Sequence, residues 1–434
     1  IEVVLVTGGL GLGGTEKGLV NHAVSFDRER ISPRVVAIDA GGPRQAHLEA
    51  AGVPVGIAGG DETELARLLE GADVVHVFRG GLTEPLLPSA VRRAGVPWLV
   101  ETNVFGAVDA SPDRDRFAAH LFVGKMCAWR YRERLGLQGP AFHERHRVLH
   151  WPIDLPRLRA AAPGRREAKR RLGLDPDRPV VGRVGRADDT KWRRLLVDMV
   201  PELLRLAPQA QVMFVGVTPD KTRRLARLGV LDRVDLVDTT ADEEEVALRF
   251  AACDVFITAA EIGESYSVAI SEAMGLGLPI VTCSTPWVDN GQIEQVDEGV
   301  TGHIADHPRA FAEACAALVN DPERAARFGA AAAAKADRLM DAAKLTRQLE
   351  TLYAGLMETG RPPDAWWPDA AEVDAFGAEY AQRLRRTFRP LTRRERAEAR
   401  WALATERARW TARALRRADT RTVLAAVRAR LRPT

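Results

Sequence analysis

The residues with the clearest chemistry lie at positions 251–285, in a strand–loop–helix–loop–strand pattern. Two carboxylates, Glu264 and Glu272, are separated there by seven residues. Glu264 lies in the polar loop after a β-branched run, and Glu272 lies about one turn inside the helix expected at 268–274. In a parallel α/β sheet, ligands bind at the loops that leave the carboxyl ends of strands. Both carboxylates are therefore candidate ligand contacts.

The start of this helix has further groups suited to a ligand. Ser265, Tyr266 and Ser267 carry hydroxyls. We expect the backbone N–H groups from Ser265 to Val268 to be free, because the first N–H groups of a helix have no intrahelical partner. Such N–H groups and the positive end of the helix dipole attract anions. A ligand with a phosphate and several hydroxyls, such as a nucleotide sugar, matches this set.

Two cations follow a strand in the second half of the chain. Arg186 ends the β-branched run at 180–186, and Lys191 comes five residues later, before the helix expected at 192–206. An arginine fork binds two oxygens at once and a lysine adds a point charge, so the pair is suited to a diphosphate. Two solvated surface cations are the alternative interpretation of the same residues.

A glycine-rich loop follows the first strand of the chain. Gly9, Gly11 and Gly14 match the spacing GxGxxG, and Asp39 closes the next strand. This pattern is typical of a dinucleotide-binding site. Glycines also allow a backbone to approach any phosphate closely. Three interpretations are open: an NAD site, a loop that closes over a phosphate from across a cleft, and a tight turn.

Alternating strand and helix patterns run through both halves, which predicts two doubly wound α/β domains of similar size. In the first half, His76 and Asn103 lie where strands end, on the edge expected to face a cleft. They are candidate contacts to a sugar or an acceptor. A histidine at such a position is also common as a hydrogen-bonded structural residue.

The composition is ordinary for a globular enzyme: 434 residues, of which 46% are hydrophobic and 28% charged. This length predicts two or three domains. No apolar run approaches ~18 residues and no signal-peptide pattern is present, so we expect a cytoplasmic protein. The net charge of +3 gives no reason to expect a nucleic-acid partner.

The cysteines are scattered without a CxxC spacing, which predicts buried reduced thiols. They are Cys127, Cys253, Cys283 and Cys315.

Taken together, these motifs resemble the retaining nucleotide-sugar glycosyltransferases of the GT-B fold, specifically glycosyltransferase family four. The resemblance covers about residues 1–355, and the Glu-x7-Glu element in its context is the most specific part. The matching segments are Gly13-Gly14-Thr15-Glu16, Gly185-Arg186 with Lys191, Glu264 and Glu272 in GESYSVAISEAMGLGLPIV, and Trp151-Pro152-Ile153-Asp154.

The resemblance implies two Rossmann-like domains that face a central cleft, followed by a C-terminal helical extension. The acceptor-binding domain would span 1–158, the nucleotide-sugar-binding domain 159–342, a crossover helix 343–358 and the basic extension 359–434.

The basic extension is rich in arginine: from Leu391 onwards there are thirteen arginines and four acidic residues. A basic amphipathic helix can lie on the inner face of an anionic membrane. A solvated or self-associating helix is the other interpretation.

The resemblance also implies roles for the site residues. Arg186 and Lys191 would hold the donor diphosphate and stabilise the leaving nucleotide. Glu272 would accept hydrogen bonds from the ribose, and Glu264 would contact the transferred sugar. Gly13 and Gly14 would approach the phosphate or sugar from the other domain. The family needs no metal and no cofactor beyond the nucleotide-sugar co-substrate. The arginine-rich composition suggests a high-GC bacterium, so a cell-envelope glycan or a natural-product precursor would supply the acceptor hydroxyl.

The sequence departs from the family pattern in two places. Family members often have a histidine in the loop after the fourth strand, whereas residues 101–106 contain none, so Asn103 or His76 would substitute. Ser265 and Tyr266 replace the usual Gly and Phe. Two alternatives stay open: an NAD-dependent oxidoreductase that uses the first-half glycine loop, and a sugar-nucleotide-binding protein without catalysis. The alternatives differ in where the nucleotide binds and in whether a sugar is transferred.

Overall fold

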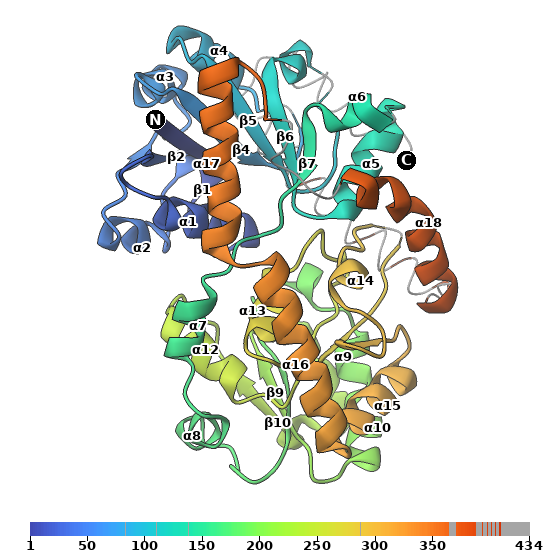
Figure 1. The fold of residues 1–434 in the computed structure, drawn as a ribbon. Helices are drawn as coiled ribbons and strands as arrows, with labels where there is room; N and C mark the ends of the chain where they lie inside the picture. The colour runs from blue at the N-terminus through green and yellow to red at the C-terminus, as the bar shows by residue number, and fades with distance from the viewer. Residues whose placement is uncertain are drawn as a thin grey trace. The chain divides into compact units, whose positions relative to one another are not determined.

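The computed structural model describes residues 1–82, 84–109, 111–137, 139–286, 288–363 and 370–387, with single residues at 393, 397, 401, 404 and 408. Most of the basic extension therefore lies outside the described residues. The chain forms two compact units (Figure 1). Unit 1 contains Ile1–Pro152 and Ala342–Ala378, and unit 2 contains Ile153–Asp341 and the second half of helix α18, from Glu379. Each unit is described by itself.

Unit 1 is built on a seven-stranded parallel sheet with the order β3-β2-β1-β4-β5-β6-β7. The order reverses between β1 and β4, as in a doubly wound fold. Val3 to Val6 on β1 are fully buried, because helices cover both faces of such a sheet. The strands are β1 Glu2–Gly9, β2 Ser32–Ala40, β3 Val55–Ile57, β4 Val74–Arg79, β5 Trp98–Asn103, β6 Phe117–Phe122 and β7 His146–Val148.

The helices of unit 1 include one that comes from far along the chain. Helix α17 packs on α1, where His22 Nδ1 lies 2.9 Å from Thr346 Oγ1. Helix α18 begins in unit 1 and ends in unit 2. The helices are α1 Gly14–Ser25, α2 Gln45–Ala50, α3 Glu62–Leu69, α4 Leu87–Arg93, the 3-10 turn η1 Pro112–Arg116, α5 Lys125–Leu135, α6 Gly139–His143, α17 Ala342–Thr359 and α18 Ala370–Thr387.

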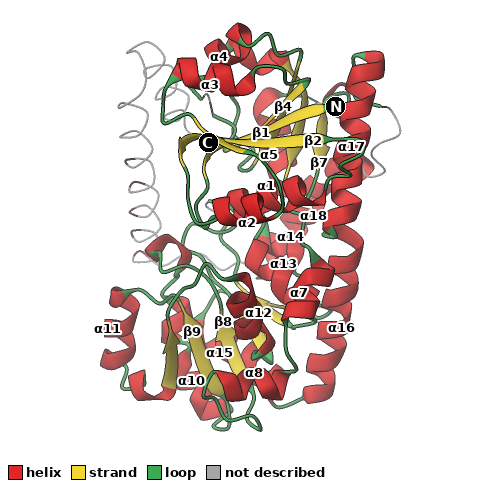
Figure 2. Ribbon diagram, turned by 90° about the vertical axis from the view of Figure 1, so that its left-hand side faces the viewer, coloured by secondary structure: helices red, strands yellow, loops and turns green. Residues whose placement is uncertain are grey.

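Unit 2 has a six-stranded parallel sheet with the order β10-β9-β8-β11-β12-β13. Here the order reverses between β8 and β11. Figure 2 shows the strands of both sheets in yellow among red helices. The strands are β8 Val180–Arg183, β9 Gln211–Val215, β10 Val234–Val237, β11 Val255–Ile257, β12 Ile280–Thr282 and β13 Gly302–Ile304.

The helices of unit 2 enclose an apolar core that includes Trp192, Phe214 and Phe311. They are α7 Leu155–Ala161, α8 Arg165–Arg171, η2 Asp189–Lys191, α9 Leu195–Asp198, α10 Val200–Leu206, α11 Pro219–Arg227, η3 Leu231–Arg233, α12 Glu243–Ala251, α13 Val268–Gly275, α14 Gln292–Gln295, α15 Pro308–Val319 and α16 Pro322–Leu339.

The predicted pair of Rossmann-like domains is confirmed by the two parallel sheets. The single helix predicted at 192–206 is wrong: it is two short helices, because Pro201 can occupy only the first turn of α10. The loop predicted at 101–106 is also shorter, since β5 continues to Asn103. All four cysteines are buried and none of them forms a disulfide, as predicted. Across the described residues we find no helix with the length and apolarity that a membrane crossing requires.

Candidate functional site

The predicted cation and carboxylate of unit 2 meet at the point where its strand order reverses. Lys191 follows β8 and Glu264 follows β11, and these strands are paired neighbours in the sheet. The Lys191 Nζ atom lies 2.9 Å from Glu264 Oε2. Both side chains are partly exposed, at 25% and 17%. In an open α/β sheet this reversal point, at the carboxyl ends of the strands, is where ligands bind.

The position of Lys191 is fixed by a short turn and by a buried arginine. Asp188 caps the turn η2, since its Oδ1 accepts a hydrogen bond from the Thr190 N–H at 3.0 Å. Arg183 donates to the Lys191 carbonyl at 3.1 Å and to the Val215 carbonyl at 2.9 Å. Its guanidinium also lies 3.9 Å from the centre of the Trp192 ring. Sequence reasoning missed Arg183, although a charged residue at the end of a buried strand was a visible signal.

Arg186 lies in the same loop but, unlike Arg183, it is exposed. Trp192 anchors this loop by hydrogen bonds. Its Nε1 donates to the Gly216 carbonyl at 2.6 Å and to the Arg186 carbonyl at 3.3 Å. Gly216 has a φ of +71°, and a Cβ there would overlap the carbonyl oxygen of Gly185. A glycine is therefore required where the exit loops of β8 and β9 touch.

Helix α13 presents its start to the same region, but its N–H groups are not all free. The Ser267 side chain caps the helix by accepting from the Ile270 N–H at 3.4 Å. The Ser267 N–H itself donates to Gln295 Oε1 at 2.6 Å. The expectation of four free donors is therefore wrong for Ser267, because α14 supplies a side-chain acceptor. Gln292 of the same helix accepts from the Glu264 N–H at 3.1 Å and so positions that loop.

The hydroxyl-bearing residues of this segment are more buried than the sequence suggested. Ser265, Tyr266 and Ser267 are all less than 9% exposed. Burial raises the pKa of the Tyr266 phenol well above its usual value, so the group stays neutral. Glu272 is the fifth residue of α13 and is 5% exposed. Val268 is partly buried. The structure thus groups these residues around the start of α13, with Glu264 the more accessible carboxylate.

The glycine loop of unit 1 connects β1 to α1. Gly13 is the residue before α1, Gly14 begins the helix, and Gly14 is exposed. Gly11 has open space around the position of a Cβ. Asp39 lies on β2 and already has an interaction partner. The loop is thus at the carboxyl end of β1, the edge at which a doubly wound sheet binds ligands.

His76 and Asn103 are placed differently from expectation, because both side chains are fully buried. His76 Nδ1 lies 2.7 Å from the Tyr353 hydroxyl and Nε2 lies 2.8 Å from Thr102 Oγ1, so both ring nitrogens are occupied. The Asn103 amide donates to the Ala107 carbonyl at 2.8 Å and accepts from the Gly106 N–H at 2.9 Å. These contacts favour structural roles for both residues, His76 in docking α17 and Asn103 in shaping the turn after β5.

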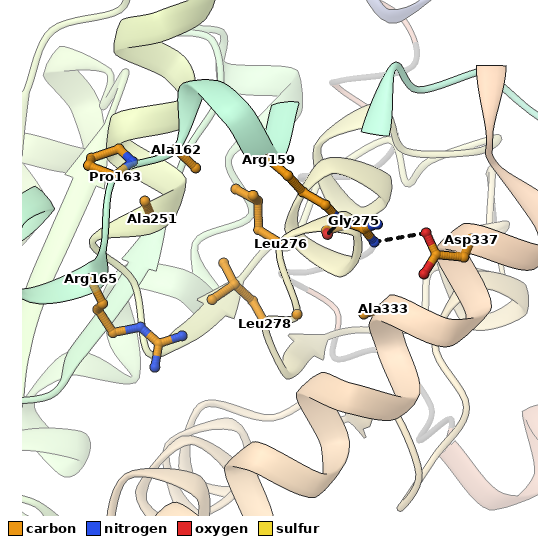
Figure 3. A pocket seen from close by; sticks show the side chains of 11 residues that line it. Arg159, Ala162, Pro163, Arg165, Ala251, Gly275, Leu276, Leu278, Ala333 and Asp337 are labelled. Carbon is orange, nitrogen blue, oxygen red and sulfur yellow. Dashed lines mark hydrogen bonds and ion pairs between the residues drawn. The ribbon is translucent and has the colours of Figure 1, made fainter. Parts of the chain in front are cut away.

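A cavity of about 540 Å³ lies elsewhere in unit 2, away from Lys191 and Glu264 (Figure 3). It is lined by α7, by the end of α13 near Gly275 and by α16, where Arg159 pairs with Asp337 at 2.9 Å. The end of α13 leads into β12, so this cavity is at the amino-terminal edge of the sheet. None of the predicted site residues lines it. We therefore locate the site by its charged groups at the opposite edge.

Among the described residues, no three His, Cys, Asp or Glu side chains are grouped as metal ligands would be.

Comparison with known sequences gives this second unit a family match. Residues 178–321 match the family described as "Glycosyl transferases group 1". A D-inositol 3-phosphate glycosyltransferase of Kineococcus radiotolerans is 31% identical over 194 residues, which cover 41% of this chain and 44% of that protein. The lipopolysaccharide core biosynthesis mannosyltransferase LpsB of Rhizobium meliloti is 28% identical over 204 residues, covering 44% and 56%. The chain spans about half the length of the curated relatives it matches.

Solved structures extend the similarity to both units. Anabaena Alr3699/HepE in complex with UDP-glucose has a TM-score of 0.65 at 19% identity, covering 82% of this chain and 99% of that one. WaaG, a glycosyltransferase involved in lipopolysaccharide biosynthesis, has a TM-score of 0.54 at 14% identity, covering 81% and 100%. At these identities the likeness concerns the fold. The predicted resemblance to GT-B glycosyltransferases is confirmed for the fold: the chain has the GT-B fold, and residues 178–321 match the group 1 glycosyl transferase family.

Proposed function

We propose that the protein is a retaining glycosyltransferase that moves a sugar from a nucleoside-diphosphate sugar to a hydroxyl acceptor. The observation that carries the proposal is the Lys191–Glu264 pair at the strand-order reversal of unit 2, beside the exposed Arg186. The family match covers both loops that hold these residues. Relatives named as glycosyltransferases, and a structural neighbour whose title reports UDP-glucose, support the same reaction class.

In this mechanism the chain's own residues act mainly through charge. Arg186 and Lys191 neutralise the diphosphate as the bond to the sugar breaks, which stabilises the departing phosphate. Glu264 accepts hydrogen bonds from hydroxyls of the sugar and holds the Lys191 ammonium in place. Glu272 accepts hydrogen bonds from the ribose. A donor phosphate oxygen assists in removing the acceptor proton, which gives retention without a dedicated protein base.

The first experiment identifies the nucleotide. Thermal-shift measurements with UDP, GDP and NAD should show stabilisation by one nucleoside diphosphate, since a ligand that binds the folded state raises its melting temperature. A panel of nucleotide sugars in a donor-hydrolysis assay then identifies the sugar. Stabilisation by NAD with no response to any nucleoside diphosphate would contradict the proposal and favour the oxidoreductase alternative, which none of the relatives reported above supports.

Matched variants separate the roles of the site residues. Glu272→Ala should weaken nucleotide binding, and Lys191→Ala should lower turnover about 100-fold or more, since each removes a charge-assisted contact. Arg223→Ala is the control, because Arg223 is an exposed arginine of α11 that pairs only loosely with Asp220 at 3.6 Å. The configuration of the glycosidic product, read by NMR coupling constants, tests retention. Wild-type activity in Lys191→Ala would reject the assigned site.

A further inference from the structure

A second cavity lies in unit 1, at the opposite edge of the sheet from the glycine loop. Its volume is about 260 Å³, smaller than the ~300–1,000 Å³ of pockets for drug-sized ligands. Arg114, Arg145, Asp115, Tyr131 and two histidines line it. These residues come from η1, from β6, from α5 and from the chain entering β7, around the amino-terminal edge of β6 and β7.

The two histidines of the cavity belong to a row of polar side chains across three strands. Glu101 of β5, His120 of β6 and His146 of β7 are paired in register, so their side chains lie side by side on one face of the sheet. The two imidazoles are stacked with centroids 5.0 Å apart and planes at 8°. A row of this kind inside a parallel sheet is unusual, because both faces of such sheets are normally apolar.

The hydrogen bonds of the two imidazoles determine what they present to the cavity. His120 Nδ1 lies 2.6 Å from Glu101 Oε2, and His146 Nδ1 lies 2.7 Å from the Phe142 carbonyl. Burial would raise the pKa of Glu101, but Arg79 and His120 outweigh it and lower the pKa to about 2, so the carboxylate only accepts. Both Nδ1 atoms therefore carry the proton. Burial and the nearby His120 lower the pKa of His146 to about 3, so its Nε2 is an acceptor at neutral pH.

Tyr131 of α5 covers this row and has an unused hydroxyl. Its ring centroid lies 5.7 Å from that of His120 and 5.3 Å from that of His146. The residue is 1% exposed, and its hydroxyl has no hydrogen-bond partner among the described residues. Leaving a buried hydroxyl unpaired is costly, so a ligand that bonds to it would be favoured. Burial raises the pKa of this phenol, which keeps it protonated and able to donate.

The rim of the cavity carries the positive charge. Arg114 and Arg145 are on its lining, whereas the Asp115 carboxylate is 74% exposed and pairs with Arg114 at 3.1 Å. An oxyanion would be attracted by the two guanidinium groups and would accept from the Tyr131 hydroxyl. The acceptor nitrogen of His146 requires, in addition, a donor on the ligand.

We propose that this cavity is a second ligand site that binds a small oxyanion bearing a hydroxyl, such as hydrogenphosphate. Arg114 and Arg145 recognise the charge, Tyr131 donates to an anionic oxygen, and His146 Nε2 accepts from the protonated oxygen. The site is independent of the glycosyltransferase proposal, because all its residues are in unit 1 and none belongs to the site in unit 2.

The test uses inorganic phosphate and sulfate as probes of the full-length protein. The Arg186→Ala/Lys191→Ala background removes the two cations of unit 2 that would compete for the same anions. Histidine side chains labelled with ¹⁵N report binding locally, and His146→Gln identifies the His146 signal by its loss. At neutral pH phosphate retains a proton and sulfate does not. We expect saturable shifts at His146 Nε2 with phosphate and at least about fivefold weaker binding of sulfate.

Two variants make the test specific. Tyr131→Phe removes only the hydroxyl and should weaken phosphate binding about tenfold, as expected for one hydrogen bond to a charged group. Arg145→Gln, at an exposed position, should weaken it at least as much. Arg116→Gln is the control for loss of one arginine near the cavity. Arg116 is on the 3-10 turn η1, as Arg114 is, but it does not line the cavity. Absent saturation, equal affinities for phosphate and sulfate, or unchanged binding in both Tyr131→Phe and Arg145→Gln would each overturn the proposal.

Discussion

Lys191 and Glu264 are 73 positions apart in the sequence, yet their charged atoms are 2.9 Å apart. The sequence predicted that both residues follow strands and carry the chemistry, because motif and loop position are local signals. Their direct ion pair follows from a non-local fact, the pairing of β8 with β11. Arg183 supplies another non-local contact, since it donates to the Val215 carbonyl of β9 at 2.9 Å.

The pair gives a prediction at the residue scale. Glu264→Gln keeps the shape of the side chain but removes the charge that holds Lys191. We expect turnover to fall about 10- to 100-fold, as for loss of a hydrogen bond to a charged group. Binding of the free nucleoside diphosphate should change less than about threefold, since a carboxylate gives no attraction to phosphate. Steady-state kinetics with the identified donor and calorimetric titration of the nucleotide measure the two effects.

The control for this substitution is another glutamate with a cationic partner. Glu202→Gln on α10 breaks the exposed pair with Arg205, and exposed pairs contribute little to stability. Its activity should stay at the wild-type level. If Glu264→Gln weakens nucleotide binding as much as turnover, then Glu264 acts on the whole donor site and its assignment to the sugar is wrong.

At the scale of elements, the alternation of strand and helix patterns predicted the type of both units, and it located α13 and β12. Buried parallel strands are recognisable because they are short β-branched runs. The partners of the helix start could not be predicted, since Gln292 and Gln295 reach back to Glu264 and Ser267 from a separate helix. The burial of His76 was equally hidden, because Tyr353 comes from a helix 277 positions away.

Gly216 gives a prediction at this scale, because it allows the exit loop of β9 to touch that of β8. Gly216→Ala places a Cβ in a backbone region that costs roughly 1–2 kcal/mol, and it also overlaps the Gly185 carbonyl. We expect a loss of stability above about 2 kcal/mol, together with weaker nucleotide binding as the Arg186 loop shifts. Urea unfolding and nucleotide titration measure the two quantities.

A second variant, Gly229→Ala, separates the cost of backbone strain from the cost of the overlap with a neighbouring atom. Gly229 has a similar φ of +69°, but a Cβ there would meet no atom within 4 Å. This variant should therefore lose only the strain energy, about 1 kcal/mol, and should bind nucleotide normally. Equal effects of the two substitutions would mean that the contact between the loops does not position the site.

At the scale of the whole molecule, unit 1 depends on a helix from the far end of the chain and on buried neutral histidines. Burial lowers the pKa of His22 to about 3, and burial followed by the nearby His22 lowers that of His76 well below its usual value. Both residues contact α17, through Thr346 and Tyr353. His146 is a third buried imidazole with a lowered pKa. Acid should therefore destabilise unit 1 and detach α17.

The direction of this pH effect follows from the number of protons that the folded and the unfolded chain bind. As the pH falls below 6.5, the unfolded chain protonates these imidazoles and the folded chain does not, so the free energy of unfolding decreases by about 1.4 kcal/mol per pH unit for each one. Glu84 acts in the opposite direction below pH 7, because burial raises its pKa to about 7 and the folded state binds its proton more tightly. Three imidazoles against one carboxyl leave a net loss of roughly 2–3 kcal/mol per pH unit between pH 6.5 and 4.5.

Hydrogen exchange in increasing urea, corrected for the intrinsic pH dependence, can follow this loss by region. Peptides from α17 should open at a clearly lower urea concentration at pH 5 than at pH 7, and those from α15 in unit 2 should shift less. His22→Gln should reduce the difference, because one titrating group is gone, whereas His303→Gln in unit 2 should leave α17 unaffected. If α17 opens at the same urea concentration at both pH values, the buried histidines do not control the stability of unit 1.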